Sequence, residues 1–417
     1  MPTLDALPAA QPVNALSREA TRALETLIGE HLGATFPALV LTVVLRGEVL
    51  VNAAWGWLDA ETRQRPTPPD ALFDLASLSK LFTATAFLRL ASAERVALDT
   101  PLVEIVPEFG ATGARPLNGG QDPHTHVMLP TPPEALGQTA DPARVTFRHL
   151  LTHTSGLAPW RAVYEVAGPP PPPPDRPDPI PRAERWRRAL DALCRYPFVG
   201  QPGDGVVRYS DLGLMLLGEA VARLDGASGA LDAALATQVT EPLELASLTF
   251  NPLAHGRERT RIPPTELDTT WRKRRCWGEV HDENACGVGG VAGHAGLFGT
   301  ARDVAALGQA WLSRDPRLGI APPLMNEALR EQARTGAVRR GLGWALKAAE
   351  DAQCGERFSA ESFGHTGFTG TSLWCDPRRA LVVAALTNRV YYGRRPEDIR
   401  AFRQALHTRI AEIVDGA

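Results

Sequence analysis

The chain has 417 residues, of which 44% are hydrophobic and 22% are charged, and its formal net charge at pH 7 is −3. These values are ordinary for a globular protein that buries a large core. They exclude the strongly basic surface typical of nucleic-acid binding, and no stripe dense in lysine or arginine is interleaved with aromatic residues.

The sequence carries no targeting or membrane-spanning pattern. Residues 1–20 lack the basic start and apolar stretch of a signal peptide, and the apolar stretch at residues 38–45 is too short to cross a membrane. The five cysteines are scattered and lack a C-x-x-C spacing, which favours reduced thiols over a disulfide framework or a zinc site. We therefore expect a cytoplasmic protein without a membrane span, with export by another route as the alternative.

The first part of the chain combines helical and strand-like spacing. In chain order it predicts a helix over residues 16–32, strands over residues 38–44 and 48–57 joined by a turn at Arg46-Gly47, and a helix over residues 79–98. Residues 110–142 are rich in Gly, Pro and Thr and predict an inserted loop.

The rest of the chain predicts helices first and strands near the C-terminus. Thr146 is a suitable N-cap for a short helix over residues 147–153, and the proline-rich segment 168–181 predicts a stiff surface spacer. Further helices are predicted over residues 182–193, 210–224, 301–312 and 397–413, and strands over residues 363–365, 371–375 and 381–387. Strands at both ends of the chain, with helices between them, indicate one sheet closed by distant segments and a mainly helical middle.

A serine and a lysine stand three residues apart at the start of the second predicted helix. Ser77 and Lys80 would share one face of that helix, so the amine can reach the hydroxyl. A serine becomes a strong nucleophile only when a base takes its proton, and lysine serves as that base when burial or cationic neighbours lower its pKa. The chain has only three lysines, and the residues around Lys80 are apolar. The pattern predicts a nucleophilic serine, with an ordinary surface lysine as the alternative.

Two further segments carry side chains suited to proton transfer and substrate binding. Tyr209 precedes a helix that Ser210 or Asp211 would cap, and its phenol can relay a proton. Glycines bracket His365-Thr366 in the segment 364–370 and allow the backbone to approach a ligand closely. Taken alone, these segments also fit a packed tyrosine before a capped helix and a glycine-rich hairpin.

In this chain order, the three segments resemble the motif set S-x-x-K, Y-x-N and K-T-G of the penicillin-recognising serine hydrolases, the β-lactamase and D,D-peptidase superfamily. The set is here Ser77/Lys80, Tyr209/Asp211 and His365-Thr366-Gly367. Segments 98–102 and 150–157 also resemble blocks of this family, so the resemblance covers nearly the whole chain.

The resemblance implies an α+β fold of the β-lactamase type. We expect a five-stranded antiparallel sheet flanked by helices, together with a mainly helical region, in a single catalytic domain over residues 1–417. The α/β part would comprise residues 16–100 and 290–417, and the inserted, mainly helical part would comprise residues 101–289.

The resemblance also implies a role for each site residue. Ser77 would be the nucleophile, Lys80 the base for acylation and Tyr209 the proton relay to the leaving group. The backbone N–H groups of Ser77 and Phe368 would form the oxyanion hole. Thr366 and the following Gly367 would line the strand beside the substrate.

Two positions depart from the β-lactamase pattern. Asp211 replaces an amide with an acid, and His365 replaces a lysine cation with a group that is mostly neutral at pH 7. The missing cation argues against recognition of a β-lactam carboxylate. Both residues are still expected to contact substrate.

A glycine-dense segment, residues 278–298, contains histidine, acidic and amide side chains. His281, Asp282 and His294 are candidate metal ligands, but we expect no metal and no cofactor. Instead, His281 and Asn284 would hold a polar substrate. This segment resembles a branch of the family similar to the exo-acting N-acetylmuramoyl-L-alanine amidases, which implies a cell-wall fragment as substrate.

The sequence therefore predicts a serine hydrolase that works through an acyl-enzyme, as an amidase or peptidase on muropeptides in peptidoglycan recycling. A carboxylesterase of small acyl esters is the first alternative. A weak β-lactamase, a non-catalytic muropeptide-binding protein and a metallohydrolase built on His281 and His294 are the others. The expected partner is a small-molecule or muropeptide substrate.

Overall fold

The computed structural model describes residues 13–416 except residues 124, 227–229 and 396. Residues 1–12, part of the segment without a signal-peptide pattern, lie outside the described residues. Within the described ranges, no helix combines the length and the apolar character that crossing a membrane would require. The five cysteines are buried, free thiols.

Helices are distributed along the described part of the chain, from Arg18 to Asp415. They are α1 (Arg18–His31), α2 (Ser79–Ser92), α3 (Phe147–Thr152), α4 (Val163–Ala167), α5 (Arg182–Leu193), α6 (Asp211–Asp225), α7 (Leu231–Leu235), α8 (Glu283–Gly287), α9 (Ala301–Ser313), α10 (Pro322–Ala328) and α11 (Glu397–Asp415).

The strands of the described residues form one large sheet and three small ones. The large sheet has nine strands, all paired antiparallel, in the order β1 (Val13–Asn14), β3 (Glu48–Gly56), β2 (Ala38–Leu45), β16 (Leu381–Thr387), β15 (Ser372–Asp376), β14 (Phe363–Thr366), β13 (Ala345–Leu346), β12 (Val338–Arg340) and β11 (Ala333–Thr335). The small sheets are β4 (Phe73–Asp74) with β10 (Leu297–Gly299) and β7 (Thr249–Phe250), β5 (Arg115–Pro116) with β6 (Thr139–Ala140), and β8 (Leu267–Asp268) with β9 (Arg274–Arg275).

The large sheet is wider than the five strands predicted, although the α+β class is confirmed. The five predicted strands are β3, β2, β16, β15 and β14, which lie side by side at its centre. The four additional strands, β1, β11, β12 and β13, have two or three residues each. Such short segments show no alternation in the sequence, because they become strands only through tertiary pairing.

Helix α2 ends at Ser92, earlier than the predicted end at residue 98. Glu94 adopts a left-handed conformation with φ of 58°, and the N–H of Arg95 donates to the carbonyl oxygen of Leu90 at 3.1 Å. This is a Schellman C-terminus, but a glutamate in place of the usual glycine gives no stop signal. The other predicted helices and strands are confirmed to within two residues at each end.

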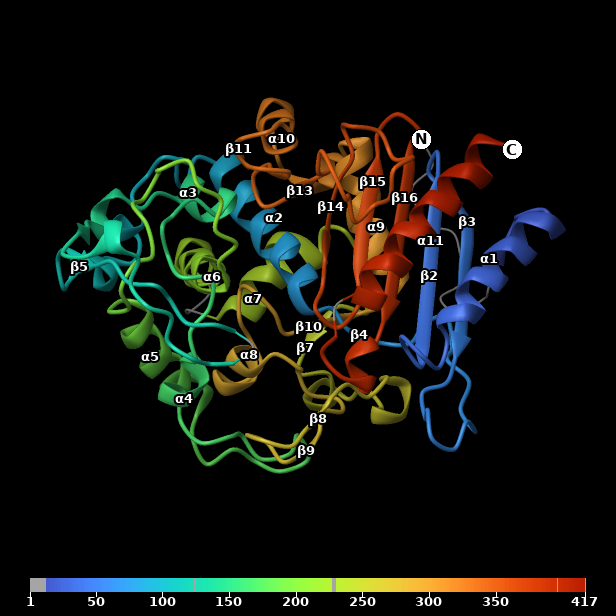
Figure 1. Cartoon of the computed structure of the whole chain (residues 1–417), viewed down its shortest axis with the longest axis horizontal. Helices are drawn as coiled ribbons and strands as arrows, with labels where there is room; N and C mark the ends of the chain where they lie inside the picture. The colour runs from blue at the N-terminus through green and yellow to red at the C-terminus, as the bar shows by residue number, and fades with distance from the viewer. Residues whose placement is uncertain (1–12, 124, 227–229, 396, 417) are drawn as a thin grey trace.

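Helices cover both faces of the large sheet. Side chains of a strand alternate between the faces, so Leu39, Leu41 and Val43 of β2 pack with α1 and α11, whereas Val40 and Val44 belong to the core on the side of α9. Figure 1 shows α11 in front of the strands of the sheet, with α1 beside it near β3. Nearly all of β2 is therefore buried.

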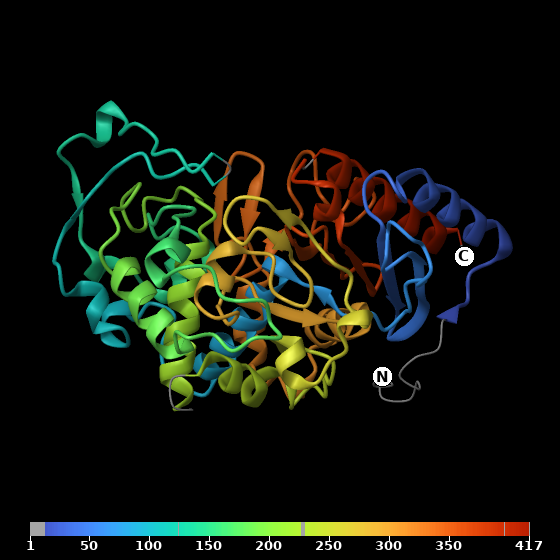
Figure 2. The same ribbon diagram turned by 90° about the horizontal axis from the view of Figure 1, so that it is seen from below.

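Helix α2 lies between the sheet and the helical middle of the chain. In both views, the green helices α3 to α6 are on one side of α2, while α1 and α11 are on the other (Figure 1, Figure 2). Almost every residue of α2 is buried. Because Ser77 lies in the short 3-10 turn that leads into α2, this central position places the serine at the junction of the two parts.

The proline-rich segment 168–181 forms neither helix nor strand, as predicted. Two arginines donate hydrogen bonds to its backbone carbonyl oxygens. Arg185 donates to the carbonyl oxygen of Pro169 at 2.9 Å, and Arg274 donates to that of Pro171 at 3.0 Å. Proline carbonyls thus find partners outside regular secondary structure.

His407 on α11 is a buried titratable group that the fold favours in its neutral form. It is fully buried and donates through Nδ1 to the carbonyl oxygen of Arg403 at 2.6 Å. Burial, with the nearby charge of Arg403, lowers its pKa from 6.5 to about 4. Between these values the unfolded chain binds a proton that the folded chain does not, so stability falls as the pH drops from 6.5 towards 4.

We expect the His407→Gln variant to lose less stability than the wild type between pH 7 and pH 4. The difference between the pKa of 6.5 in the unfolded chain and about 4 in the folded chain corresponds to about 3 kcal/mol of the free energy of unfolding. Urea denaturation at each pH measures this free energy. The control variant, His255→Gln at an exposed position, should follow the wild-type curve. An unchanged pH dependence in His407→Gln would contradict the assignment.

Candidate active site

Ser77 lies in a strained turn between β4 and α2. The turn is a short 3-10 helix (Ala76–Leu78) that leads directly into α2. Ala76 has φ of 47°, a conformation that a residue other than glycine keeps only when its surroundings impose it. The carboxylate of Asp74 contributes, because it accepts the N–H of Ala76 at 2.9 Å and that of His281 at 2.6 Å.

The loop between β14 and β15 holds the same turn from the other side. The hydroxyls of Thr369 and Thr371 donate to the carbonyl oxygens of Asp74 and Leu75 at 2.8 and 3.0 Å. A Cβ atom on Gly367 would lie 2.0 Å from Thr371 Oγ1 and 2.7 Å from the carbonyl oxygen of Leu75. Only glycine therefore allows the end of β14 to approach the serine turn so closely.

Lys80 is almost completely buried, and three oxygens surround its amine. Nζ lies 2.8 Å from Ser77 Oγ, 3.0 Å from the carbonyl oxygen of His294 and 2.8 Å from Asp211 Oδ1. An ammonium group has three N–H donors and no lone pair. The three oxygens therefore match a protonated lysine.

The pKa of Lys80 is raised, whereas the buried position expected from the sequence favoured a lowered pKa. Burial does disfavour the charged form, but the carboxylate of Asp211 and the side chain of Tyr209 outweigh it and raise the pKa above its usual value. The acid at position 211 is the main reason, because it stabilises the ammonium across a short distance in a site with little water. Lys80 is thus a cation in the resting site, and the expectation of a lowered pKa is wrong.

Tyr209 stands at the N-terminus of α6 with its ring beside Lys80. Ser210 is the N-cap of this helix, and its hydroxyl accepts the N–H of the third helical residue at 3.2 Å. The centroid of the Tyr209 ring lies 5.0 Å from Lys80 Nζ, and 4.6 and 5.8 Å from the ring centroids of His153 and His365. The three motif segments therefore meet in space.

The two histidines beside Tyr209 are buried and neutral. Burial, together with nearby cations, holds the pKa of both His153 and His365 well below 6.5. His365 Nδ1 lies 2.8 Å from the carbonyl oxygen of Thr366, which can only accept, so Nδ1 carries the proton and Nε2 is an acceptor. His153 Nδ1 accepts the N–H of Ser210 at 3.0 Å.

Asp211, Asp282 and His294 offer ligand atoms within 4.8 Å of one another, a spacing that could hold a metal ion. Lys80 already supplies a positive charge to this group, through its ion pair with Asp211. Although burial opposes it, His294 and Lys80 also help to lower the pKa of Asp282. The acids thus serve to hold the lysine cation.

His281 and Asn284 brace the site from within the protein. His281 Nε2 lies 2.8 Å from Glu266, and its ring stacks on Phe368 with a centroid distance of 5.7 Å. The amide of Asn284 accepts the N–H of Tyr164 at 3.0 Å and donates to a backbone carbonyl at 2.9 Å. Both oxygen and nitrogen of this amide are therefore bonded to backbone.

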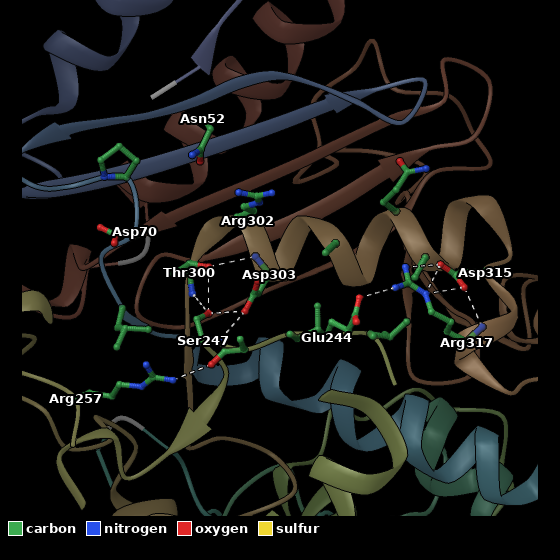
Figure 3. Close-up of a pocket in the computed structure, with 18 of the residues that line it drawn as sticks. Asn52, Asp70, Glu244, Ser247, Arg257, Thr300, Arg302, Asp303, Asp315 and Arg317 are labelled. Atoms are coloured by element: carbon green, nitrogen blue, oxygen red, sulfur yellow. Dashed lines mark hydrogen bonds and ion pairs between the residues drawn. The ribbon is translucent and has the colours of Figure 1, made fainter. Parts of the chain in front are cut away.

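A cavity of about 1240 Å³ lies elsewhere, along α9, and Ser77, Lys80 and Tyr209 do not line it. Polar groups of its wall bond to one another in Figure 3: Ser247 Oγ donates to Asp303 at 2.6 Å, and Arg317 pairs with Glu244 at 3.3 Å. Ser77, unlike Ser247, contacts a buried amine and lies in a site that also contains Tyr209, so we place the chemistry at Ser77.

Sequence reasoning assigned no role to four residues that shape the site. His153 lies inside segment 150–157, which carried part of the resemblance, and Asp74 stands three residues before Ser77, but neither position revealed its contacts. Thr369 and Thr371 act through hydrogen bonds to residues almost 300 positions earlier in the chain. No local pattern could have indicated such a contact.

Known proteins with similar sequences or folds include hydrolases. The family profile described as Beta-lactamase matches residues 24–407. An N-acetylmuramyl-L-alanine amidase of Bacillus subtilis (strain 168) is 29% identical over 398 residues, covering 89% of this chain and 82% of the relative. A putative D-alanyl-D-alanine carboxypeptidase of Escherichia coli (strain K12) is 26% identical over 394 residues, covering 88% and 81%.

A solved structure shows the same fold at low sequence identity. EstCE1, a hydrolase with promiscuous acyltransferase activity, has a TM-score of 0.67 and 19% identity to this chain, and the match covers 93% of this chain and 99% of that structure. The likeness extends over both the sheet and the helical middle.

We expect the Gly367→Ala variant to lose most of its hydrolytic activity. The added methyl group cannot fit between Thr371 and Leu75, so β14 must move away from the serine turn. A displacement of about 1 Å at a catalytic group can lower the rate about 100-fold, so we expect kcat/KM to fall by about 100-fold or more. Gly29→Ala on α1 is the control, because its Cβ meets no atom within 4 Å. That variant should keep its activity and gain up to about 1 kcal/mol of stability. Full activity in Gly367→Ala would refute the tight contact.

Proposed function

The chain belongs to the β-lactamase family and is a serine hydrolase, and from this premise we propose that Ser77 forms an acyl-enzyme with cell-wall-derived muropeptides. The observation that carries the proposal is the 2.8 Å contact between Lys80 Nζ and Ser77 Oγ, in a site that also contains Tyr209 and Asp211. Similarity to the Bacillus subtilis amidase supports an amide between a lactyl group and L-alanine as the bond that is cleaved.

Acylation begins with attack of Ser77 Oγ on the carbonyl carbon of the amide. As the Oγ–C bond forms, the serine proton moves to Lys80, and Lys80 gives one of its own protons to Asp211, whose Oδ1 is 2.8 Å from Nζ. The amine remains an ammonium, and the carboxylate becomes a carboxylic acid. The raised pKa of Lys80 supports this relay, since a lysine that is already protonated cannot itself keep a further proton.

The oxyanion and the leaving amine need separate partners. The backbone N–H groups of Ser77 and Phe368 stabilise the negative oxygen of the tetrahedral intermediate. Tyr209 donates its phenolic proton to the leaving nitrogen as the C–N bond breaks, and Lys80 stabilises the phenolate that results.

Water then releases the acyl group. The Tyr209 phenolate takes a proton from the attacking water, and the proton on Asp211 returns through Lys80 to Ser77 as the ester bond breaks. The site is then in its starting state, and one amide and one water have become one acid and one amine. Thr366 and Gly367 line the strand beside the acyl group, with His365 next to them.

A carboxylesterase of small acyl esters is the second candidate. The observation that favours it is the neutral, buried state of His365 at a position where the family pattern has a cation. The same serine chemistry cleaves esters, whose leaving alcohol needs less help from Tyr209 than an amine does.

A muropeptide digest separates these candidates. We expect the wild type to release free peptide from N-acetylmuramoyl-peptides, detected by mass spectrometry, and to react with a fluorophosphonate at Ser77. The Ser77→Ala variant should do neither, while keeping the wild-type melting temperature. Rapid hydrolysis of p-nitrophenyl butyrate without any peptide release would favour the esterase, and peptide release by Ser77→Ala would refute the acyl-enzyme.

We expect the Asp211→Asn variant to lose 10²- to 10⁴-fold in kcat, roughly the contribution of a general base. The substitution removes the proton acceptor, and it also lowers the pKa of Lys80, because burial is then opposed only by Tyr209. The measurement is the pH dependence of kcat and kcat/KM.

The control for this variant is Asp204→Asn, which removes an exposed acid paired with Arg208 rather than with Lys80. It should leave the pH profile unchanged. Retained or increased activity of Asp211→Asn at neutral pH would show that Lys80 alone accepts the serine proton.

A further inference from the structure

Arg403 on α11 is a buried arginine without a charge partner. Its side chain is 6% exposed, its Nε is buried without an acceptor, and no carboxylate of the described residues is paired with it. Burial, together with the nearby charge of Arg389, lowers the pKa of Arg403 to about 9. The fold therefore keeps this cation inside at a cost in free energy.

The guanidinium group of Arg403 contacts the loop between β14 and β15. Nη2 donates to the carbonyl oxygens of Gly367 and Thr371, at 2.7 and 2.8 Å. Helix α11, which carries this arginine, lies in front of the strands in Figure 1. A cation from the C-terminal helix thus reaches the loop that holds the serine turn.

Neither carbonyl depends on Arg403 for a partner. The N–H of Gly370 donates to the carbonyl oxygen of Gly367 at 3.1 Å, and the N–H of Gly367 donates to that of Thr371 at 2.7 Å. A carbonyl oxygen has two lone pairs, so the arginine adds a second, charged bond to each. Satisfaction of the backbone therefore does not account for the buried cation.

The carbonyl of Gly367 and the N–H of Phe368 belong to one peptide group. No peptide bond in the described part of the chain is cis, and in a trans peptide the C=O and the N–H point in opposite directions. A cation at the oxygen draws electron density towards it and makes the N–H a stronger donor, because hydrogen bonds in a chain polarise one another. Arg403 therefore acts on the peptide group that serves the oxyanion in the mechanism.

We propose that Arg403 is a positioning residue for the oxyanion hole, because it holds and polarises the peptide group whose N–H, that of Phe368, stabilises the tetrahedral intermediate. This inference rests on the proposed function, which assigns the Phe368 N–H to the oxyanion. Loss of a whole oxyanion donor lowers kcat by about 10²- to 10³-fold. Loss of the polarising charge, with the N–H still in place, removes part of that factor.

Arg389 provides a matched comparison in the same loop. Like Arg403 it is buried, with a side chain 4% exposed and a pKa lowered to about 10, chiefly by burial. Its Nε donates to the carbonyl oxygen of Phe368 at 2.8 Å. That carbonyl shares its peptide group with the N–H of Thr369, which the mechanism does not use. The two arginines thus make the same kind of bond to adjacent peptide groups.

An activated ester and a boronic acid test the role of Arg403. Hydrolysis of p-nitrophenyl acetate reports acylation of Ser77 through kcat/KM, and phenylboronic acid forms a tetrahedral adduct with Ser77 Oγ that resembles the intermediate. We expect Arg403→Gln and Arg403→Met each to lower kcat/KM about 10-fold and to raise the inhibition constant of the boronic acid by about the same factor. Arg403→Lys keeps the charge and should stay within about threefold of the wild type in both measurements.

The control variant is Arg389→Gln, which should also stay within about threefold in both measurements, even if its melting temperature falls. Arg403→Met removes the buried charge with a side chain of similar length, so it should fold even if the glutamine variant does not.

Three results would overturn the inference. They are wild-type values in Arg403→Met, a loss in Arg403→Lys as large as in Arg403→Met, and a loss in Arg389→Gln as large as in Arg403→Met. The last would show that both arginines act only through the stability of the loop. A wild type that neither cleaves the ester nor reacts with a fluorophosphonate at Ser77 would instead contradict the proposed function.

Discussion

The site depends on one buried ammonium group and the oxygens that surround it. Lys80 on α2 contacts the serine one helical turn earlier, a carboxylate at the start of α6 and the carbonyl oxygen of His294, which lies 214 residues away along the chain. A buried ammonium without partners would cost several kcal/mol. The chain can therefore keep Lys80 inside only when the helical middle closes onto α2, and the same closure assembles the catalytic groups.

The nucleophile depends on a second long-range contact. The turn at Ala76 has a positive φ, and it is held by Asp74 on one side and by Thr369 and Thr371 on the other. Those threonines follow β14, so the C-terminal strands of the sheet fix a turn that precedes the second helix of the chain. Hydroxyl groups suit this task, because they satisfy backbone carbonyls that a turn leaves without partners. Activity at Ser77 thus requires both ends of the chain in their native pairing.

The sequence predicted those parts of the structure that local pattern determines. The five central strands, the hairpin turn at Arg46-Gly47 and most helix ends follow from hydrophobic spacing and caps, and φ values of 53° and 85° at that turn suit the right-handed twist of the strands. Strands of two or three residues could not be predicted, because pairing alone defines them. The motifs identified the groups that meet at the site, but they could not give the charge of Lys80, which depends on the distance between two side chains.

The two departures from the family pattern, at Asp211 and His365, are related through their effect on the charge of the site. In the pattern S-x-x-K, Y-x-N and K-T-G, both lysines can carry charge and the middle position is neutral. Here Asp211 is an acid, His365 is neutral, and the second cation is Arg340, which comes from a strand two places along the sheet. An acid at position 211 raises the pKa of Lys80, and in the mechanism proposed above the carboxylate then accepts the serine proton through Lys80. A lysine in place of His365 would add a positive charge beside Tyr209, where the guanidinium of Arg340 already lies 5.2 Å from the ring centroid, whereas the neutral histidine adds none.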